Sequence, residues 1–160
     1  MAATCAAFIG LLCVLTPSVA FGAETLSTQL SAVKRVYQKS AGKTIEAYVP
    51  FTKALPGELV VYTLDYANTG DAPAADVVIT LPIPAEMTFV PASADHPDAV
   101  LTYSVDGGQT FGELEKLTIT NADGLVRPAR ADDVNTLRWA LRLPLPPGSK
   151  GQLKYSAFLK

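Results

Sequence analysis

Apolar and polar residues alternate with a period of two along much of this chain. The clearest case is residues 136–143, TLRWALRL. Its two faces are Leu137, Trp139, Leu141 and Leu143 on one side, and Arg138, Ala140 and Arg142 on the other. Successive side chains of a strand point to opposite faces, so this pattern predicts a strand with one buried side. Pro144 cannot donate a ladder hydrogen bond, and we expect the strand to end there.

The same reasoning predicts further strands along the chain. They are residues 59–66, 77–81, 101–105, 117–120 and 152–159, with residues 32–37 and 45–51 as strands of less defined register. Turn residues separate them, including Pro56-Gly57, Asn68-Thr69-Gly70-Asp71, Asp123-Gly124 and Pro147-Gly148. Residues 27–37 can alternatively be drawn as a short helix. Seven or eight short strands with regular turns predict an all-β fold, an antiparallel β-sandwich of the immunoglobulin type.

The first residues of the chain predict export. Residues 1–22 carry no charge, and they contain an apolar run, then Pro17 and small residues, in the order of a cleavable signal peptide. No Lys or Arg precedes the run, and an uncleaved anchor is the alternative, although the run is shorter than the ~20 residues that span a bilayer. We expect residues 23–43 to be an N-terminal extension or first strand and residues 44–160 to be the β-sandwich. The expected location is periplasmic or extracellular.

Composition excludes several classes of site. Both cysteines, Cys5 and Cys13, lie in the expected signal peptide, and His96 is the one histidine, so we expect no disulfide, no metal site and no cofactor. A net charge of -2 offers no basic surface for nucleic acid. Nearly half of the residues are apolar, which is typical of a globular domain with a core of its own.

Residues 56–94 resemble the immunoglobulin-like repeat of domain of unknown function eleven. The shared elements are Pro56-Gly57, the run Tyr66-Ala67-Asn68-Thr69-Gly70, the Ala-rich residues 72–75, Leu81-Pro82 and the strand Thr88-Phe89-Val90. Thr80 stands where that family often has an acid. Later stretches (SVDGGQTF, NTLRWAL and LPPGSKGQLKYSAFL) resemble its single-domain bacterial members. The resemblance implies an exported, non-catalytic domain of the cell envelope or surface, without a defined ligand.

Residues 103–111, YSVDGGQTF, resemble an Asp-box, the hairpin signature repeated around sialidase-type propellers. Asp106 would accept hydrogen bonds from turn amides, and Phe111 would pack beneath the hairpin. A propeller needs about four or more blades, and this motif occurs once. Asp-Gly and Gly-Gly between alternating residues favour a structural hairpin. A role for Asp106 in binding Ca²⁺ is the alternative, although no dense acidic loop accompanies it.

Other chemically capable residues have simple structural interpretations. His96 lies in a polar loop, and Asp132 and Asp133 lie side by side before the Trp139 strand; a base and a paired acid are the functional alternatives. We expect Trp139 in the core rather than in a sugar-binding platform. We also expect Tyr62, Tyr66 and Tyr155 to be core or interface residues. No residue is assigned a catalytic, cofactor-binding or metal-binding role.

These observations predict a structural or interaction module that is not an enzyme. It would bind a protein partner or a copy of itself through edge strands, and an N-terminal strand that completes a neighbour's sheet could build a filament. One alternative is a carbohydrate-binding or accessory domain, with Tyr48, Phe51, Phe89 and Phe111 as the candidate aromatic residues. A small extracytoplasmic hydrolase is the other, although no nucleophile with a base stands in a recognisable frame.

Overall fold

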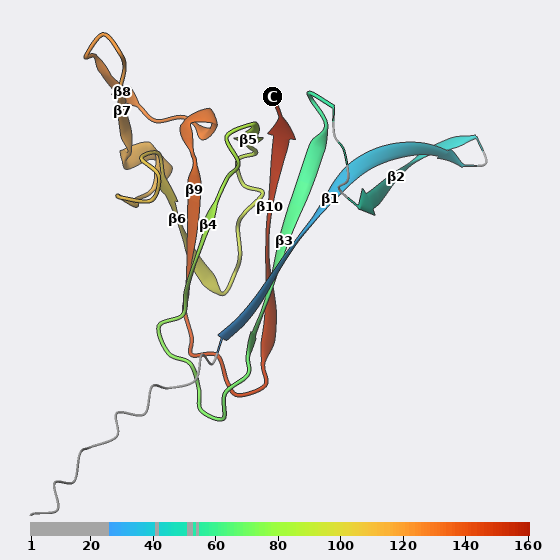
Figure 1. Cartoon of the computed structure of the whole chain (residues 1–160), viewed down its shortest axis with the longest axis vertical. Coiled ribbons are helices and arrows are strands. Elements are labelled where there is room, and N and C mark those ends of the chain that lie inside the picture. The colour runs from blue at the N-terminus through green and yellow to red at the C-terminus, as the bar shows by residue number, and fades with distance from the viewer. Residues whose placement is uncertain (1–25, 41, 51–52, 54) are drawn as a thin grey trace, which may run out of the picture.

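The computed structural model describes residues 26–160 except residues 41, 51, 52 and 54. The predicted signal peptide, both cysteines and Phe51 lie outside these residues. Ten strands follow one another along the described chain (Figure 1). They are β1 (Leu26–Ser40), β2 (Lys43–Pro50), β3 (Leu59–Asn68), β4 (Val78–Pro82), β5 (Met87–Phe89), β6 (Ala99–Ser104), β7 (Thr118–Thr120), β8 (Val126–Pro128), β9 (Thr136–Leu141) and β10 (Lys150–Leu159). Two 3₁₀ turns, η1 (Leu114–Lys116) and η2 (Ala131–Asp133), lie between them.

The strands form two sheets and a small ribbon, and every pairing is antiparallel. The larger sheet has the order β2-β1-β3-β10-β5, the smaller has the order β4-β9-β6, and β7 pairs with β8. The two sheets face each other, with β9 and β4 opposite β3 and β10 (Figure 1). The prediction of an all-β, antiparallel fold is therefore confirmed.

Side chains from both sheets make the core. β3 contributes every second residue from Val60 to Tyr66, and β10 contributes Leu153, Tyr155 and Ala157. Tyr62 and Tyr155 are register partners whose rings stack 4.7 Å apart. β9 adds Leu137 and Trp139, both with no exposed surface. The alternation that predicts these strands also predicts their buried faces.

Strand β9 is shorter than its sequence pattern indicates. It ends at Leu141, and Leu143, which the pattern places on the buried face, is 72% exposed. Its antiparallel partner β6 extends no further, because β6 begins at Ala99, opposite Leu141. Beyond this point Leu145 enters the core instead and bridges Ala74.

The N-terminal segment is a strand, and the alternative of a short helix over residues 27–37 is wrong. Residues 26–34 of β1 pair with β3 in the body of the protein. From Val33 to Ser40 the same strand pairs with β2. We call the paired segments Val33–Ser40 and Lys43–Pro50 the arm. The arm projects from the two facing sheets (Figure 1).

Candidate functional site

The stretch that resembles an Asp-box is a closed loop after β6. Its two ends meet where Tyr103 and Gly112 exchange backbone hydrogen bonds. The Asp106 carboxylate accepts bonds from the Ser104 hydroxyl and the Thr110 hydroxyl, each at 2.6 Å. The backbone N–H groups of Gln109 and Thr110 also donate to it, at 3.0 Å. Together these donors hold the pKa of Asp106 far below its ordinary value.

The base of this loop is packed by an aromatic ring. The edge of Phe111 lies under Gly108, where an added Cβ atom would be 3.6 Å from the ring. The Arg138 guanidinium covers Phe111 at 3.4 Å from the ring centroid. Such a cation over an aromatic face is attractive. The Asp106 carboxylate and the Phe111 ring are therefore both engaged in holding this turn, as the hairpin interpretation predicts.

The paired carboxylates Asp132 and Asp133 are separated by their partners. Asp133 forms a two-pronged ion pair with Arg127, with N–O distances of 2.6 and 2.7 Å. It also accepts the backbone N–H of Arg130 at 2.8 Å, and these contacts lower the pKa of Asp133. Asp132 faces the Arg130 side chain at 3.5 Å. Asp133 thus ties the β7–β8 ribbon to η2.

His96 and the large aromatic residues occupy structural positions. His96 Nδ1 accepts the backbone N–H of Asp98 at 3.2 Å, which closes its own loop. Trp139 is fully buried, as predicted, and its indole N–H donates to the carbonyl oxygen of Ala94 at 2.8 Å. The expected core tyrosines, Tyr62, Tyr66 and Tyr155, are all buried.

The four aromatic candidates for sugar binding do not form one row. Phe89 is buried, and Phe111 lies beneath Arg138. Tyr48 is exposed on the arm, where its hydroxyl donates to Glu46 at 2.5 Å. This bond raises the pKa of the Tyr48 hydroxyl. Phe51 is outside the described residues.

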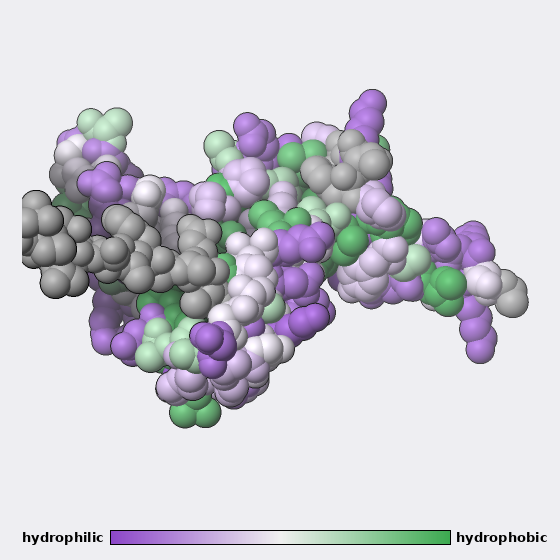
Figure 2. All heavy atoms as spheres, turned by 60° about the horizontal axis from the view of Figure 1, so that its bottom comes forward, coloured by the Kyte–Doolittle hydropathy of each residue, from purple (hydrophilic) through white to green (hydrophobic). Residues whose placement is uncertain are grey.

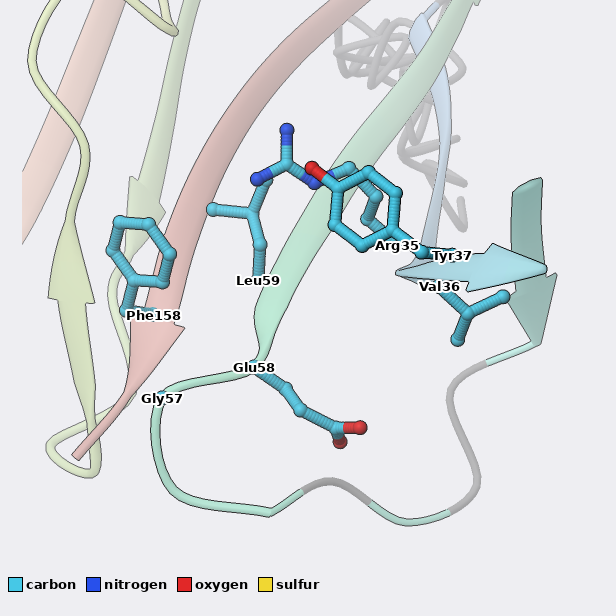
Figure 3. Close-up of a pocket in the computed structure, with 7 residues that line it drawn as sticks. All are labelled: Arg35, Val36, Tyr37, Gly57, Glu58, Leu59 and Phe158. Atoms are coloured by element: carbon cyan, nitrogen blue, oxygen red, sulfur yellow. The ribbon is translucent and has the colours of Figure 1, made fainter. Parts of the chain in front are cut away.

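A surface that the sequence analysis missed lies where the arm joins the body. A hollow of ≈ 490 Å³ opens there between the arm and the turn before β3. In Figure 3 the side chains of Arg35, Tyr37, Leu59 and Phe158 gather on one side of the sheet, whereas Val36 points away. Tyr37 is 64% exposed and Phe158 is 40% exposed. The Arg35 guanidinium lies 5.5 Å from the centre of the Tyr37 ring.

Strand register explains how residues so far apart in sequence meet. Tyr48 pairs with Arg35 across the arm, and Leu59 pairs with Phe158 across β3 and β10. Lys34 pairs with Val60, so Arg35 lies on the same sheet face as Leu59. A row of residues thus crosses four strands on the outer face of the larger sheet. We call Arg35, Tyr37, Tyr48, Leu59 and Phe158 the outer-face cluster.

Two ion pairs lie near this cluster, one on each face of the sheet. On the opposite, inner face, Lys34 forms an ion pair with Glu58 at 3.2 Å, and Glu58 also accepts the backbone N–H of Leu55 at 2.7 Å. These bonds lower the pKa of Glu58. Arg35 approaches Glu46 at 3.9 Å. The outer-face cluster therefore offers aromatic and aliphatic surface beside an arginine, and aromatic residues and arginine are enriched at protein interfaces.

Metal sites and membrane-spanning helices are both absent from the described part of the chain. It holds no group of three or more His, Cys, Asp or Glu side chains placed to bind a metal ion. Within residues 26–160, gaps aside, no helix has the length and apolar composition needed to cross a bilayer.

A scan against protein-family models found no match, and searches of curated proteins and of solved structures found no similar protein.

Proposed function

We propose that this protein is an exported, immunoglobulin-like module of the bacterial cell envelope or surface that acts by binding protein and catalyses no reaction. Its binding surface is the arm with the adjoining outer-face cluster. The proposal for export rests on the signal-peptide pattern of residues 1–22. The immunoglobulin-like assignment is supported by two facing antiparallel sheets around a buried tryptophan, and by the resemblance of residues 56–94.

The observation that carries this function is the arm. A two-stranded hairpin is marginally stable in water by itself, and here one of its strands is anchored in the larger sheet. Three large apolar side chains of the arm, Tyr37, Ile45 and Tyr48, are nevertheless exposed. Figure 2 shows the arm standing out from the body, with hydrophobic atoms among hydrophilic ones. A partner that covers these side chains would stabilise the hairpin and gain affinity from aromatic contacts.

A non-catalytic role is supported by the chemically capable side chains, because their polar atoms bind neighbours within the fold. Asp106 holds a turn, Asp133 holds a ribbon, and the indole N–H of Trp139 donates a hydrogen bond to a buried carbonyl oxygen. A general acid or base needs a titrating atom that reaches a substrate. In each of these three residues the polar atoms are already committed to neighbours in the same chain.

Site-specific photocrosslinking in the native host tests this function. A photoreactive phenylalanine analogue replaces Tyr37 on the arm, and a matched analogue replaces Leu143, which is exposed on the body. We expect a discrete protein adduct from position 37 and none from position 143. Mass spectrometry of the adduct identifies the partner, and the mature N-terminus reports export. Equal labelling at both positions, or a chain that stays in the cytoplasm with its first residues intact, would contradict the proposal.

The hollow beside the arm favours carbohydrate binding as a second candidate. Sugar rings stack on exposed aromatic faces, and Tyr37 and Phe158 both line the hollow together with Arg35. A glycan array with the purified protein tests this function. Binding that is lost in Tyr37→Ala and in Phe158→Ala, but kept in Leu143→Ala, would favour it. An array without any bound glycan would eliminate it.

A further inference from the structure

The first half of β1 leaves one of its edges open. On one side, residues 26–34 pair with β3. On the other side, β2 covers β1 only from Val33 onward and ends at Pro50, the partner of Val33. Residues 26–32 therefore have no strand partner on that side among the described residues (Figure 1).

This open edge lacks the usual protection against pairing. Natural edge strands carry charged residues, prolines or bulges that discourage another strand from adding. Residues 26–32 read LSTQLSA and contain no charge and no proline. Their backbone pairs residue for residue with β3, without a bulge. Seven residues of regular strand are thus available for β-strand addition.

When two copies of this edge pair in a two-fold arrangement, each face of one strand meets the same face of the other. Leu30 pairs with the core residue Leu64 and so lies on the inner face, as do Leu26, Thr28 and Ala32. The outer face carries the polar residues Ser27, Gln29 and Ser31. When two copies run antiparallel with Gln29 opposite Gln29, inner-face residues meet inner-face residues and polar residues meet polar ones.

Such an arrangement would also cover an exposed core-face residue. Leu30 is 52% exposed although it lies on the inner face, because it stands at the margin of the larger sheet. In the two-fold arrangement Leu30 lies opposite Thr28 of the second copy. The apolar layer of one sheet would then continue into the next, which removes Leu30 from water.

We propose that two copies of this chain join edge to edge through residues 26–32, with the two-fold axis at Gln29, and so merge two five-stranded sheets. This goes beyond the proposed function, because the contact is the open edge of β1 at residues 26–32 and not the arm. Pro50 limits the paired length, because the end of β2 occupies the same edge at Val33. The same segment serves both copies, so the contact is closed and yields a dimer rather than a filament.

Analytical ultracentrifugation over a concentration series tests the dimer, with the protein produced from its full coding sequence. We expect a reversible dimer for the wild type. Gln29→Glu places two carboxylates opposite each other at the axis, and the Asp65 opposite residue 29 on each β3 adds to the repulsion. Like charges brought together in this way weaken association strongly, so the dissociation constant should rise about tenfold or more. Gln38→Glu is the matched control, because Gln38 is also exposed on β1 but β2 already covers its edge.

A mixing experiment separates dimer contact from loss of fold. Gln29→Lys should also weaken the dimer, and an equal mixture of the Gln29→Lys and Gln29→Glu proteins should restore it as a heterodimer. A wild type that stays monomeric, a mixture without heterodimer, or equal effects of Gln29→Glu and Gln38→Glu would overturn the dimer. If the arm still captures a protein at position 37 while the chain is monomeric, the proposed function stands and the dimer alone fails.

Discussion

The ring of Tyr66 on β3 lies where any side chain at Gly151 on β10 would have to stand. The two residues are direct register partners, and a Cβ atom added to Gly151 would come within 2.2 Å of both Cζ and the hydroxyl oxygen of Tyr66. Gly151 is therefore required by packing, and Tyr66 fills the space that the missing side chain leaves.

Gly151→Ala should lower the free energy of unfolding by about 1–3 kcal/mol, the usual cost of overpacking a core. The measurement is chemical denaturation followed by circular dichroism. The double variant Gly151→Ala/Tyr66→Ala should be more stable than the sum of the two single losses implies, because removing the ring relieves the clash. Strict additivity of the two changes would refute this account of Gly151.

Asp106→Asn should make stability less dependent on pH in acid. The pKa of Asp106 is lowered in the folded protein, so its contribution to stability is present above the unfolded pKa of about 4 and is lost as pH falls below it. The melting temperature of the wild type should therefore drop more steeply than that of Asp106→Asn between neutral pH and strong acid. Gln109→Ala is a suitable control, since it removes a bond to the Asp106 backbone but no titrating group. If the melting temperatures of wild type and Asp106→Asn fell equally with pH, a stabilising role of the ionised Asp106 would be contradicted.

Trp139→Phe should destabilise the protein by about 2–4 kcal/mol. The smaller ring leaves a cavity, and the buried carbonyl oxygen of Ala94 loses its donor. Trp139 is the one tryptophan in the sequence, so its fluorescence reports its own environment. We expect emission typical of a buried indole in the native wild type and a red shift on unfolding. Tyr48→Phe, on the exposed arm, should leave stability nearly unchanged.

Asn68→Ala should cost about 2 kcal/mol, because its buried amide ties the end of β3 to the turn that follows it and to the distant segment at Leu145. Its Nδ2 donates to the carbonyl oxygens of Ala72 and Leu145, both at 2.8 Å, and its Oδ1 accepts the N–H of Gly70 at 2.9 Å. Thermal unfolding measures the loss, with Asn121→Ala in an exposed turn as the control. An equal effect at both positions would show that the buried bonds at Asn68 contribute little.

The strands that sequence predicts best are those whose alternation continues across the core. β3 and β10 bury every second residue, and each has a neighbour on both sides. The pattern fails at Leu143 because alternation describes one strand, whereas burial requires partners, and the partners of β9 end opposite Leu141. The three-residue strands β5 and β8 are too short for a periodic signal.

The outer-face cluster was not predictable from the sequence for a related reason. Tyr37 and Phe158 stand near opposite ends of the chain, and only the register of β1, β3 and β10 brings them to one hollow. In the arm both faces are largely exposed, so its residues lack the contrast between buried and exposed positions on which periodicity depends. The Asp-box hairpin, in contrast, follows from local chemistry, and sequence predicts it well.

β1 belongs to the body along its first half and to the arm along its second. The arm is consequently not suspended on a flexible tether; its direction is set by a continuous backbone ladder that begins beside β3. A pull or twist applied by a partner at Tyr37 would pass along β1 to its neighbour β3, which contributes Tyr62 to the Tyr62–Tyr155 stack. A force on the arm would therefore be transmitted to the core between the two sheets.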